Sequence, residues 1–372
     1  EEKIAEYMIH TNFFKPFYKK SYEKRFSILF IVDISESMNI WEDFINNFIK
    51  DVENYHIFKN VNTYYMFTDE NTPELYKKKV KSFKLNNNWF KSIEQNTLIF
   101  MFSDMISNSW SNGKILSDIT LWQQYFNFSI IQMLPQRLWN KTKLIDANIG
   151  KMSNPQKFSL NSKIQSSIEK MLATEGVDLD KLLKIPLLNF DEKSIEAYGR
   201  VINSLRNNRI DGAIFESEDF TGEYKFLKIE NDIETENRLK IFYKYASSLS
   251  KELLELFAFI PLSFPIMKLV QQNLLSQSTQ EHLSEILISN IINREKKIDG
   301  FFQFYKAKKE EGIREKLIKK IGAKKAFETT VKLSKIIQQQ GGTFDFLSYI
   351  IDPTSIKENK EISEIDREFA RI

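Results

Sequence analysis

Residues 25–38 read Arg-Phe-Ser-Ile-Leu-Phe-Ile-Val-Asp-Ile-Ser-Glu-Ser-Met. The nearly unbroken apolar run over residues 26–32, with its β-branched members, predicts a strand that is buried on both faces. The run stops at Asp33, and polar oxygens then recur at every second residue, in Asp33, Ser35 and Ser37. Such a strand delivers an acid and two hydroxyls to its carboxyl end, where open α/β sheets bind their ligands.

The composition is that of a folded protein with room for two domains. The chain has 372 residues, of which 42% are hydrophobic and 31 are phenylalanine, so sizeable cores are possible. Its 53 basic and 50 acidic residues leave a formal charge of +3, and such a mixture creates no global field for nucleic acid or anionic lipid. We therefore expect neither nucleic acid nor a membrane as a partner.

The absence of cysteine and of a long apolar run indicates the cellular compartment of the protein. The sequence contains no cysteine, which excludes disulfides and thiolate metal sites and favours a reducing, cytoplasmic compartment. No apolar run approaches the roughly 18 residues of a membrane span. The first residues, Glu-Glu-Lys-Ile, lack both a signal-peptide pattern and a Met, and we expect further sequence upstream.

Strand-like and helix-like segments alternate over residues 25–150. Apolar residues at helical spacing over residues 40–52 predict an amphipathic helix directly after the first strand, with Ser37 as its cap. This alternation predicts an α/β fold with a doubly wound, mostly parallel sheet. The other strands and the helix predicted in this region lie at 61–67, 97–102, 114–125 (the helix) and 128–133.

The first domain is predicted to extend to residue 230. Residues 147–175 have a polar composition that is typical of a linker or of an excursion from the domain. A helix over 191–206 and a short strand at 213–215, which returns to the sheet, are predicted to follow. The charged residues 230–236 then mark the boundary.

The second domain, residues 237–352, is predicted to be helical. A small hairpin around residues 301–305 would follow three short helices, which is the outline of a winged helix. Residues 1–24 predict a lead-in helix over 4–18, and residues 353–372 a charged tail. The helices predicted in the second domain lie at 237–250, 251–260, 265–275, 279–293, 311–321 and 324–340.

The acid and hydroxyl groups of the first turn suit a magnesium ion. Mg²⁺ prefers octahedral oxygen ligation and keeps several waters, so hydroxyls can bind it directly while carboxylates act through water. Asp104 follows another predicted central strand, and neighbouring strand ends lie about 4.8 Å apart, which lets Asp104 face the same ion. Thr68 or Thr72, from the intervening segment, would supply a third hydroxyl. The alternative is that Asp33, Ser37 and Asp104 only cap helices.

In combination these motifs resemble the metal-ion-dependent adhesion site of von Willebrand factor A domains. Further stretches resemble one bacterial branch, the von Willebrand A-like N-terminal module of multidomain conflict and signalling proteins, often encoded near MoxR-type ATPases. One departure is Met105, which follows Asp104 where many such domains have glycine. The matching stretches are Val-Asp-Ile-Ser-Glu-Ser-Met-Asn-Ile-Trp (32–41), Phe-Ser-Asp (102–104), Trp-Ser-Asn-Gly (110–113), Leu-Pro-Gln-Arg-Leu-Trp (134–139), Pro-Ile-Met-Lys-Leu-Val-Gln (265–271), His-Leu-Ser-Glu-Ile (282–286) and Gly-Ile-Arg-Glu-Lys (312–316).

The resemblance implies a set of partners and ligands. A protein partner would supply an acidic residue to the ion, and a MoxR-type ATPase and an effector domain beyond Ile372 would complete the system. An oligomer is compatible with this organisation. The implied metal ligands are Asp33, Ser35, Ser37, Thr68 and Asp104, and the residues expected to contact the partner are Met38, Thr72 and Trp110.

We therefore predict a non-catalytic sensor or adaptor of an antiphage-defence or signalling protein, which binds a partner through Mg²⁺ and relays the signal to the effector. One alternative is a phosphoryl-transfer enzyme or nuclease that uses Asp33 and Asp104, but such sites usually gather more carboxylates than hydroxyls. A second is a metal-free scaffold in which Asp33 caps a helix. DNA binding is disfavoured because the candidate recognition helix, 279–293, carries Glu281 and Glu285 and little positive charge.

Overall fold

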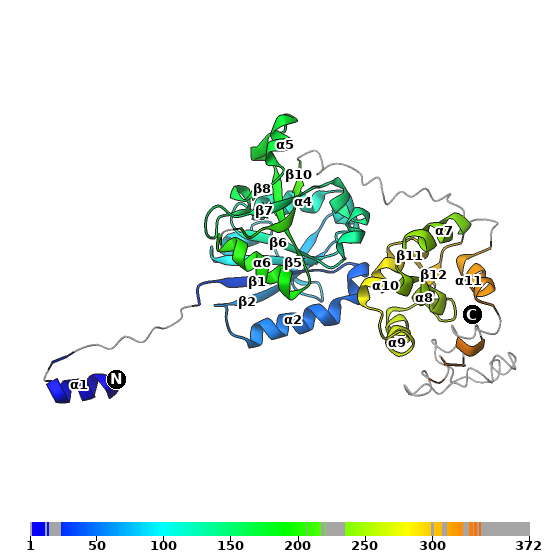
Figure 1. The fold of residues 1–372 in the computed structure, drawn as a ribbon, viewed down its shortest axis with the longest axis horizontal. Coiled ribbons are helices and arrows are strands. Elements are labelled where there is room, and N and C mark those ends of the chain that lie inside the picture. Colours follow the sequence, from blue (N-terminus) through cyan, green and yellow to red (C-terminus); the bar gives the residue numbers. More distant parts are fainter. Residues whose placement is uncertain are drawn as a thin grey trace.

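The strand that begins at Ser27 and ends at Asp33 (β1) lies inside a ten-stranded sheet of the computed structural model (Figure 1). The strand order is β4-β3-β2-β1-β5-β6-β9-β10-β7-β8. Four strands continue a parallel block with β1, namely β2 (Val61–Phe67), β5 (Thr97–Ser103), β6 (Asn127–Gln132) and β9 (Leu183–Asn189). The others join antiparallel at the two edges: β3 (Glu74–Lys78), β4 (Ser82–Lys84), β7 (Asn148–Ser153), β8 (Gln165–Ser166) and β10 (Ile210–Phe215).

The structure describes only part of the chain. The described residues are 2–11, 13–14, 24–205, 207–216, 220, 235–298, 301–306, 311–322, 327–329, 331–332 and 335. The predicted lead-in helix, 4–18, is present in part as α1 (Glu2–Thr11), since residues 13–14 are not helical. Residues 15–23 lie outside this set. The predicted tail, 353–372, and most of the predicted helix at 324–340 also lie outside it.

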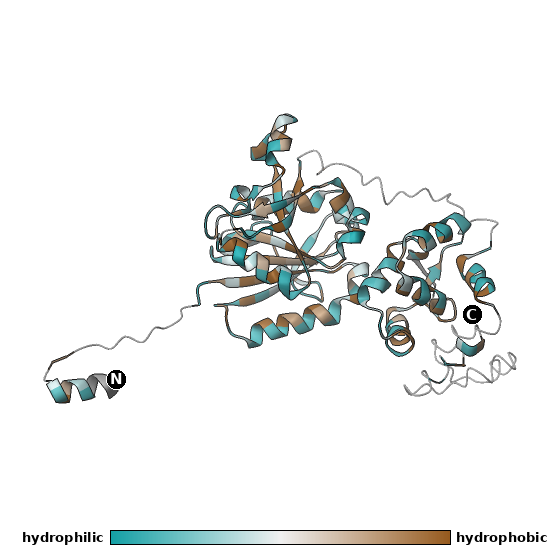
Figure 2. Cartoon of the chain, in the orientation of Figure 1, coloured by the Kyte–Doolittle hydropathy of each residue, from teal (hydrophilic) through white to brown (hydrophobic). Residues whose placement is uncertain are grey.

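Helices cover both faces of the parallel block. Alternate β1 residues, such as Phe30, pack in one apolar core with α2 (Glu42–Asn54) and α6 (Glu192–Ile202). Intervening residues, such as Ile31, pack in a second core with α3 (Asn108–Ser111) and α4 (Lys114–Trp122). Every residue of β1 is therefore buried, as predicted, and Figure 2 shows α2 banded in teal and brown, as expected of a helix with one apolar face. The predicted doubly wound α/β fold is confirmed at this level.

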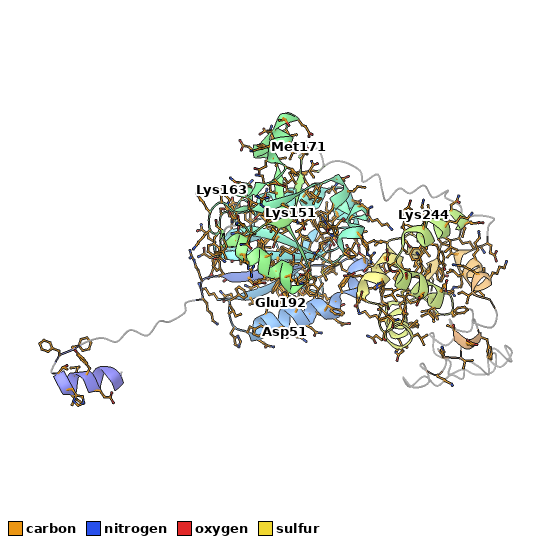
Figure 3. The ribbon with its side chains drawn as sticks, in the orientation of Figure 1. Asp51, Lys151, Lys163, Met171, Glu192 and Lys244 are labelled. Atoms are coloured by element: carbon orange, nitrogen blue, oxygen red, sulfur yellow. The ribbon has the colours of Figure 1, made fainter. Side chains whose placement is uncertain are left out.

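Of the two alternatives for residues 147–175, the linker is wrong. This segment forms β7 and β8, which extend the sheet beyond β10, and the short helix α5 (Glu169–Thr174). In β7 only Gly150 and Met152 are buried, so its sequence lacks the apolar run that marks a central strand. Figure 3 shows Met171 on α5, and Lys244 in the separate helical part of the molecule.

The sequence also gave no prediction of β9, although that strand joins the two halves of the sheet. Its apolar run is interrupted by Lys184 and Pro186, which are uncommon in buried strands. Lys184 is accommodated because its ammonium pairs with Glu169 at 2.5 Å and donates to the Ile164 carbonyl at 3.0 Å. Buried charge is tolerated only where it is paired in this way.

The second domain is helical, as predicted, and contains a hairpin. The helix predicted over 279–293 is shorter than expected, because α10 ends at Leu287 and residues from Ile292 form the first strand of that hairpin. The two strands, β11 (Ile292–Ile298) and β12 (Phe301–Phe304), are antiparallel. The helices are α7 (Thr235–Tyr245), α8 (Ser248–Phe257), α9 (Phe264–Leu274), α10 (Gln280–Leu287) and α11 (Ile313–Ile321).

Short 3₁₀ helices carry several of the connections. The helix predicted after the first strand is divided, because η1 (Glu36–Ile40) precedes α2, and the side chain of Ser37 does not cap α2. The helical domain meets the sheet at this point, since α10 packs against η1 (Figure 1). None of the helices in the described residues is long and apolar enough to span a bilayer. The remaining 3₁₀ helices are η2 (Trp89–Ser92), η3 (Gln136–Lys141), η4 (Lys143–Asp146), η5 (Asn161–Lys163) and η6 (Leu179–Lys181).

Candidate functional site

Asp33 ends β1 and accepts hydrogen bonds from three different segments. Thr68 Oγ1 donates to Oδ1, Ser103 Oγ donates to Oδ2 at 2.5 Å, and Trp110 Nε1 donates to Oδ2 at 3.1 Å. The carboxyl group is fully buried. Its partners are Thr68 after β2, Ser103 at the end of β5 and Trp110 in α3. None of them lies on the helix that follows Asp33, so Asp33 joins separate segments and does not cap a helix.

The register of the sheet explains why these groups meet. β1 pairs in parallel with both β2 and β5, so that Val32 lies beside Tyr65 on one side and Phe102 on the other. The residues that follow each strand therefore emerge at the same edge. Thr68 directly follows β2, and Ser103 and Asp104 lie at the end of β5.

Ser35 and Ser37 lie in the turn that follows β1, and their hydroxyl oxygens are 3.3 Å apart. Two neighbouring ligands of an octahedral ion at about 2.1 Å would be separated by about 3.0 Å, so the pair fits direct coordination of Mg²⁺. The backbone N–H of Glu36, between them, donates to Asp69 Oδ2 at 3.0 Å. This bond ties the serine turn to the loop that carries Thr68.

Asp104 is buried in the loop after β5. Its Oδ1 accepts the backbone N–H of Ile106 at 3.2 Å, and its backbone carbonyl accepts a bond from Gln132 Nε2 at 3.3 Å. Met105, at the position where the resemblance leads one to expect glycine, has a φ of 59°. This left-handed conformation favours glycine. Here a methionine adopts it, and its side chain is almost completely buried.

The two carboxyl groups influence each other. Burial and the nearby negative charge of Asp104 raise the pKa of Asp33 to about 7, although the hydrogen bonds from Ser103, Thr68 and Trp110 oppose the shift. Both causes disfavour a second negative charge at this edge of the sheet. A cation beside the two carboxyl groups would offset that repulsion.

Some of the predicted site residues meet at Asp33 as expected, and others do not have the predicted role. Thr68 hydrogen-bonds to Asp33, whereas Thr72 is exposed further along the same loop. Met38 and Trp110, which were expected to contact a partner, are buried, so a partner cannot reach them in this conformation. Trp110 instead orients Asp33 through its indole N–H.

Two residues of the site were missed from the sequence. Ser103 donates to Asp33, and Gln132, at the end of β6, holds the Asp104 loop. The position of Ser103 beside Asp104 at a strand end was a usable signal, since both belong to the same edge. Nothing in the sequence around Gln132 distinguishes it from an ordinary polar residue at a strand end.

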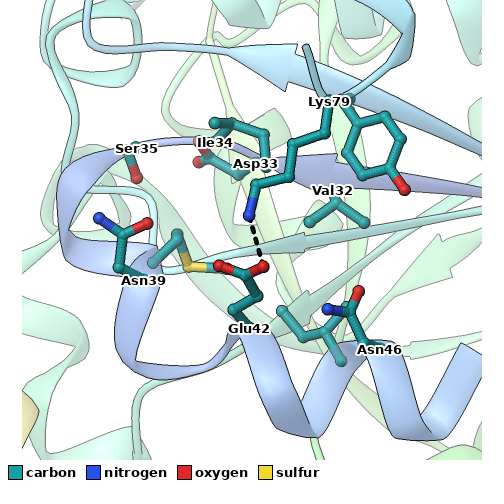
Figure 4. Close-up of a pocket in the computed structure, with 11 residues that line it drawn as sticks. Val32, Asp33, Ile34, Ser35, Asn39, Glu42, Asn46 and Lys79 are labelled. Atoms are coloured by element: carbon teal, nitrogen blue, oxygen red, sulfur yellow. Dashed lines mark ion pairs between the residues drawn. The ribbon is translucent and has the colours of Figure 1, made fainter. Parts of the chain in front are cut away.

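A small cavity adjoins the site on the side of α2 (Figure 4). Its volume is about 20 Å³, which is room for about one water molecule. Asp33, Ser35 and Asn39 contribute to its lining, and Lys79 pairs with Glu42 at 2.5 Å beside it. The cavity can hold a water but not the side chain of a partner.

The donor set is rich in hydroxyls and poor in carboxylates. Within the described residues, no group of three or more His, Cys, Asp or Glu side chains is placed to hold a metal ion. Ion binding at this edge would therefore depend on Ser35, Ser37 and Thr68 together with Asp33 and Asp104. That combination matches the hard, oxygen-only preference of Mg²⁺.

The comparisons with known proteins leave the family open. No family model matches the chain, and no curated protein or solved structure shows a significant match. The fold and the site together define an α/β protein whose hydroxyl and carboxyl groups meet at the carboxyl edge of a parallel sheet.

Proposed function

We propose that this chain is a non-catalytic recognition module that binds Mg²⁺ at the carboxyl edge of its sheet and uses the ion to hold an acidic residue of a protein partner. The observation that carries the proposal is the convergence of three loops. Ser35 and Ser37, Thr68, and Asp104 follow three different strands. Thr68 and Ser103, the residue before Asp104, donate to Asp33, and the N–H of Glu36, between the two serines, donates to Asp69.

The chemistry of the site supports recognition more than turnover. Ser35, Ser37 and Thr68 would bind the ion directly, and Asp33 and Asp104 would hold it through water. Because hydroxyl ligands neutralise little of its charge, the ion would remain able to accept a carboxylate from outside. A nuclease or phosphoryl-transfer enzyme would normally surround its ions with more carboxylates than the two present here.

The wider proposal follows the resemblance described above. The α/β part would be a von Willebrand A-like domain, the helical part a winged-helix-like domain, and the whole a cytoplasmic sensor or adaptor in a bacterial conflict or signalling protein. A MoxR-type ATPase is a candidate partner, and an effector domain would lie beyond Ile372. Helix α10 supports a packing role over a DNA-reading role, because Leu283, Glu285 and Ile286 on it are buried.

The test is calorimetric titration of the purified chain with Mg²⁺, repeated with Mn²⁺. We expect the wild type to bind one ion, Asp33→Ala and the double variant Ser35→Ala/Ser37→Ala to bind none, and Ser92→Ala to behave as the wild type. Ser92 is a suitable control because its hydroxyl bonds only to the Trp89 carbonyl, in η2. Equal binding by the wild type and the double variant, or no binding by the wild type, would overturn the proposal.

A further inference from the structure

Two segments of the candidate site are in direct contact with the helical domain. η1, which carries Ser37, packs against α10. Ile106, two residues after Asp104, lies in a separate apolar cluster with Leu134, Leu138 and Ile288, and Ile288 immediately follows α10. A movement of either loop therefore changes the surface on which α10 is seated.

The same contact contains a charge pair whose acidic member is buried, while the side chain of its basic member, Arg137, is 41% exposed. Glu285 of α10 is 3% exposed and accepts a bond from Arg137 Nη1 at 2.8 Å, across the domain boundary. It also accepts bonds from Ser250 Oγ at 2.7 Å and Ser247 Oγ at 2.8 Å, within the helical domain. A buried carboxylate needs all its partners, so this contact favours one relative position of the two domains.

Gln132 links the charge pair to the site. Its side chain donates to the Asp104 carbonyl at 3.3 Å and accepts the backbone N–H of Leu134 at 2.9 Å. Leu134 belongs to the apolar cluster with Ile288, and Arg137 follows it in η3. The Asp104 loop and the segment that holds α10 are thus joined by direct hydrogen bonds.

The groups that would bind the ion are nearly inaccessible in this arrangement. Ser35 is 3% exposed, Ser37 is 7% exposed and Asp104 is 1% exposed. A carboxylate from a partner can approach an ion held there only after η1 or the Asp104 loop has moved. Because α10 packs on η1 and the cluster with Ile288 packs on Ile106, the seated helical domain opposes both movements.

We propose that the helical domain is an inhibitory cover of the ion site, that the Arg137–Glu285 pair adds to the apolar contacts that hold it closed, and that capture of a carboxylate requires its release. The inference rests on the proposed function and adds that the helical domain inhibits carboxylate binding at the ion site. Coupling is reciprocal: loosening the cover strengthens carboxylate binding, and carboxylate binding loosens the cover. The released α10 is then the signal that further parts of the protein can detect.

The test uses Arg137→Gln on the full chain. This variant removes the charge that crosses the boundary but leaves Glu285 with Ser247 and Ser250, so the helical domain keeps its internal bonds. Arg200→Gln is the matched control, because Arg200 pairs with Glu196 at 2.6 Å on the exposed side of α6. Circular dichroism and hydrogen exchange of β1 verify that both variants are folded.

The probe is Mn²⁺ followed by acetate, monitored by water proton relaxation. Acetate displaces water from bound Mn²⁺, so relaxation reports carboxylate capture directly. We expect Arg137→Gln to bind acetate at least about fivefold more tightly than the wild type, and Arg200→Gln to match the wild type. In the wild type, Mn²⁺ with acetate is expected to speed hydrogen exchange in α10.

Each outcome bears on a different claim. Suppose that the wild type binds Mn²⁺, and that all three proteins bind acetate equally or Arg137→Gln binds it more weakly. The proposed inhibition by the helical domain is then wrong, and the proposed ion site is not contradicted. If α10 exchange does not respond to acetate, the reciprocal coupling is wrong. If the wild type binds no Mn²⁺, the proposed function fails and the cover fails with it.

Discussion

Asp33 is the residue on which the site depends, because its carboxyl group joins β1 to the loop after β2, through Thr68, and to the segment from β5 to α3, through Ser103 and Trp110. The serines differ from it. Ser35 and Ser37 have contacts mainly with each other, so they contribute little to the fold. At the scale of single residues, ion binding and stability can therefore be separated by substitution.

Ser35→Ala is expected to weaken Mg²⁺ binding about tenfold or more, a loss that already occurs for groups that only orient metal ligands. Its free energy of unfolding without metal is expected to fall by less than about 1 kcal/mol, because one long hydroxyl contact is lost. Calorimetry and urea unfolding measure the two quantities. A large loss of stability with unchanged ion binding would show that Ser35 is a structural residue.

Trp110→Phe is expected to lower the free energy of unfolding by about 2–4 kcal/mol, since it removes a bond to a buried carboxyl group and leaves a space. Trp122→Phe is the control, because Trp122 is buried in the same apolar core and forms no bond to Asp33. Urea unfolding should show a larger loss for Trp110→Phe. Equal losses would mean that the bond to Asp33 contributes nothing measurable.

At the scale of elements, the strands that the sequence predicts best are those with apolar runs, such as β1 and β5, or with regular alternation, as in β2. β1, β2, β5 and β6 form where they were predicted, and their carboxyl ends bring Asp33, Thr68 and Asp104 to one edge. β7 and β9 were harder to predict because tertiary contacts compensate for local sequence that is unfavourable in a buried strand. Lys184 is paired inside β9, and β7 relies on close packing against β10.

The packing of β7 on β10 depends on Gly212. A Cβ atom there would lie 2.1 Å from Met152 Sδ, and Met152 is fully buried, so it cannot move freely. Gly212→Ala is expected to cost about 1–3 kcal/mol of unfolding free energy. In the double variant Gly212→Ala/Met152→Ala, the loss should be smaller than the sum of the single losses. Strict additivity in urea unfolding would contradict this packing.

At the scale of the whole molecule, the two domains share one apolar core. Phe30 and Met38 of the α/β part belong to the same cluster as Met267 and Ile286 of the helical part. Lys268 of α9 also pairs with Asp43 of α2 at 2.9 Å. The helical domain is therefore a packed part of the structure, and the charge pair at Glu285 should influence global stability.

Burial alone would raise the pKa of Glu285, but hydrogen bonds from Ser250 and Ser247 and the charge of Arg137 outweigh it, so the pKa is lowered. A lowered pKa contributes stability that is present above the ordinary value of 4.5 and is lost as the pH falls through the folded value. The wild type should therefore lose its stability advantage over Glu285→Gln as the pH is lowered from about 5 into the range below 4.5. Urea unfolding across that range measures the difference, and a constant difference would contradict the assignment.

The central claim is that Ser35, Ser37, Thr68, Asp33 and Asp104 surround one divalent ion. Crystals grown with Mn²⁺ and measured for anomalous scattering test it most directly. A single strong peak is expected at about 2.2 Å from the hydroxyl oxygens of Ser35 and Ser37, with Asp33 and Asp104 beyond its bound waters. A peak elsewhere, or none at this edge of the sheet at saturating Mn²⁺, would contradict it.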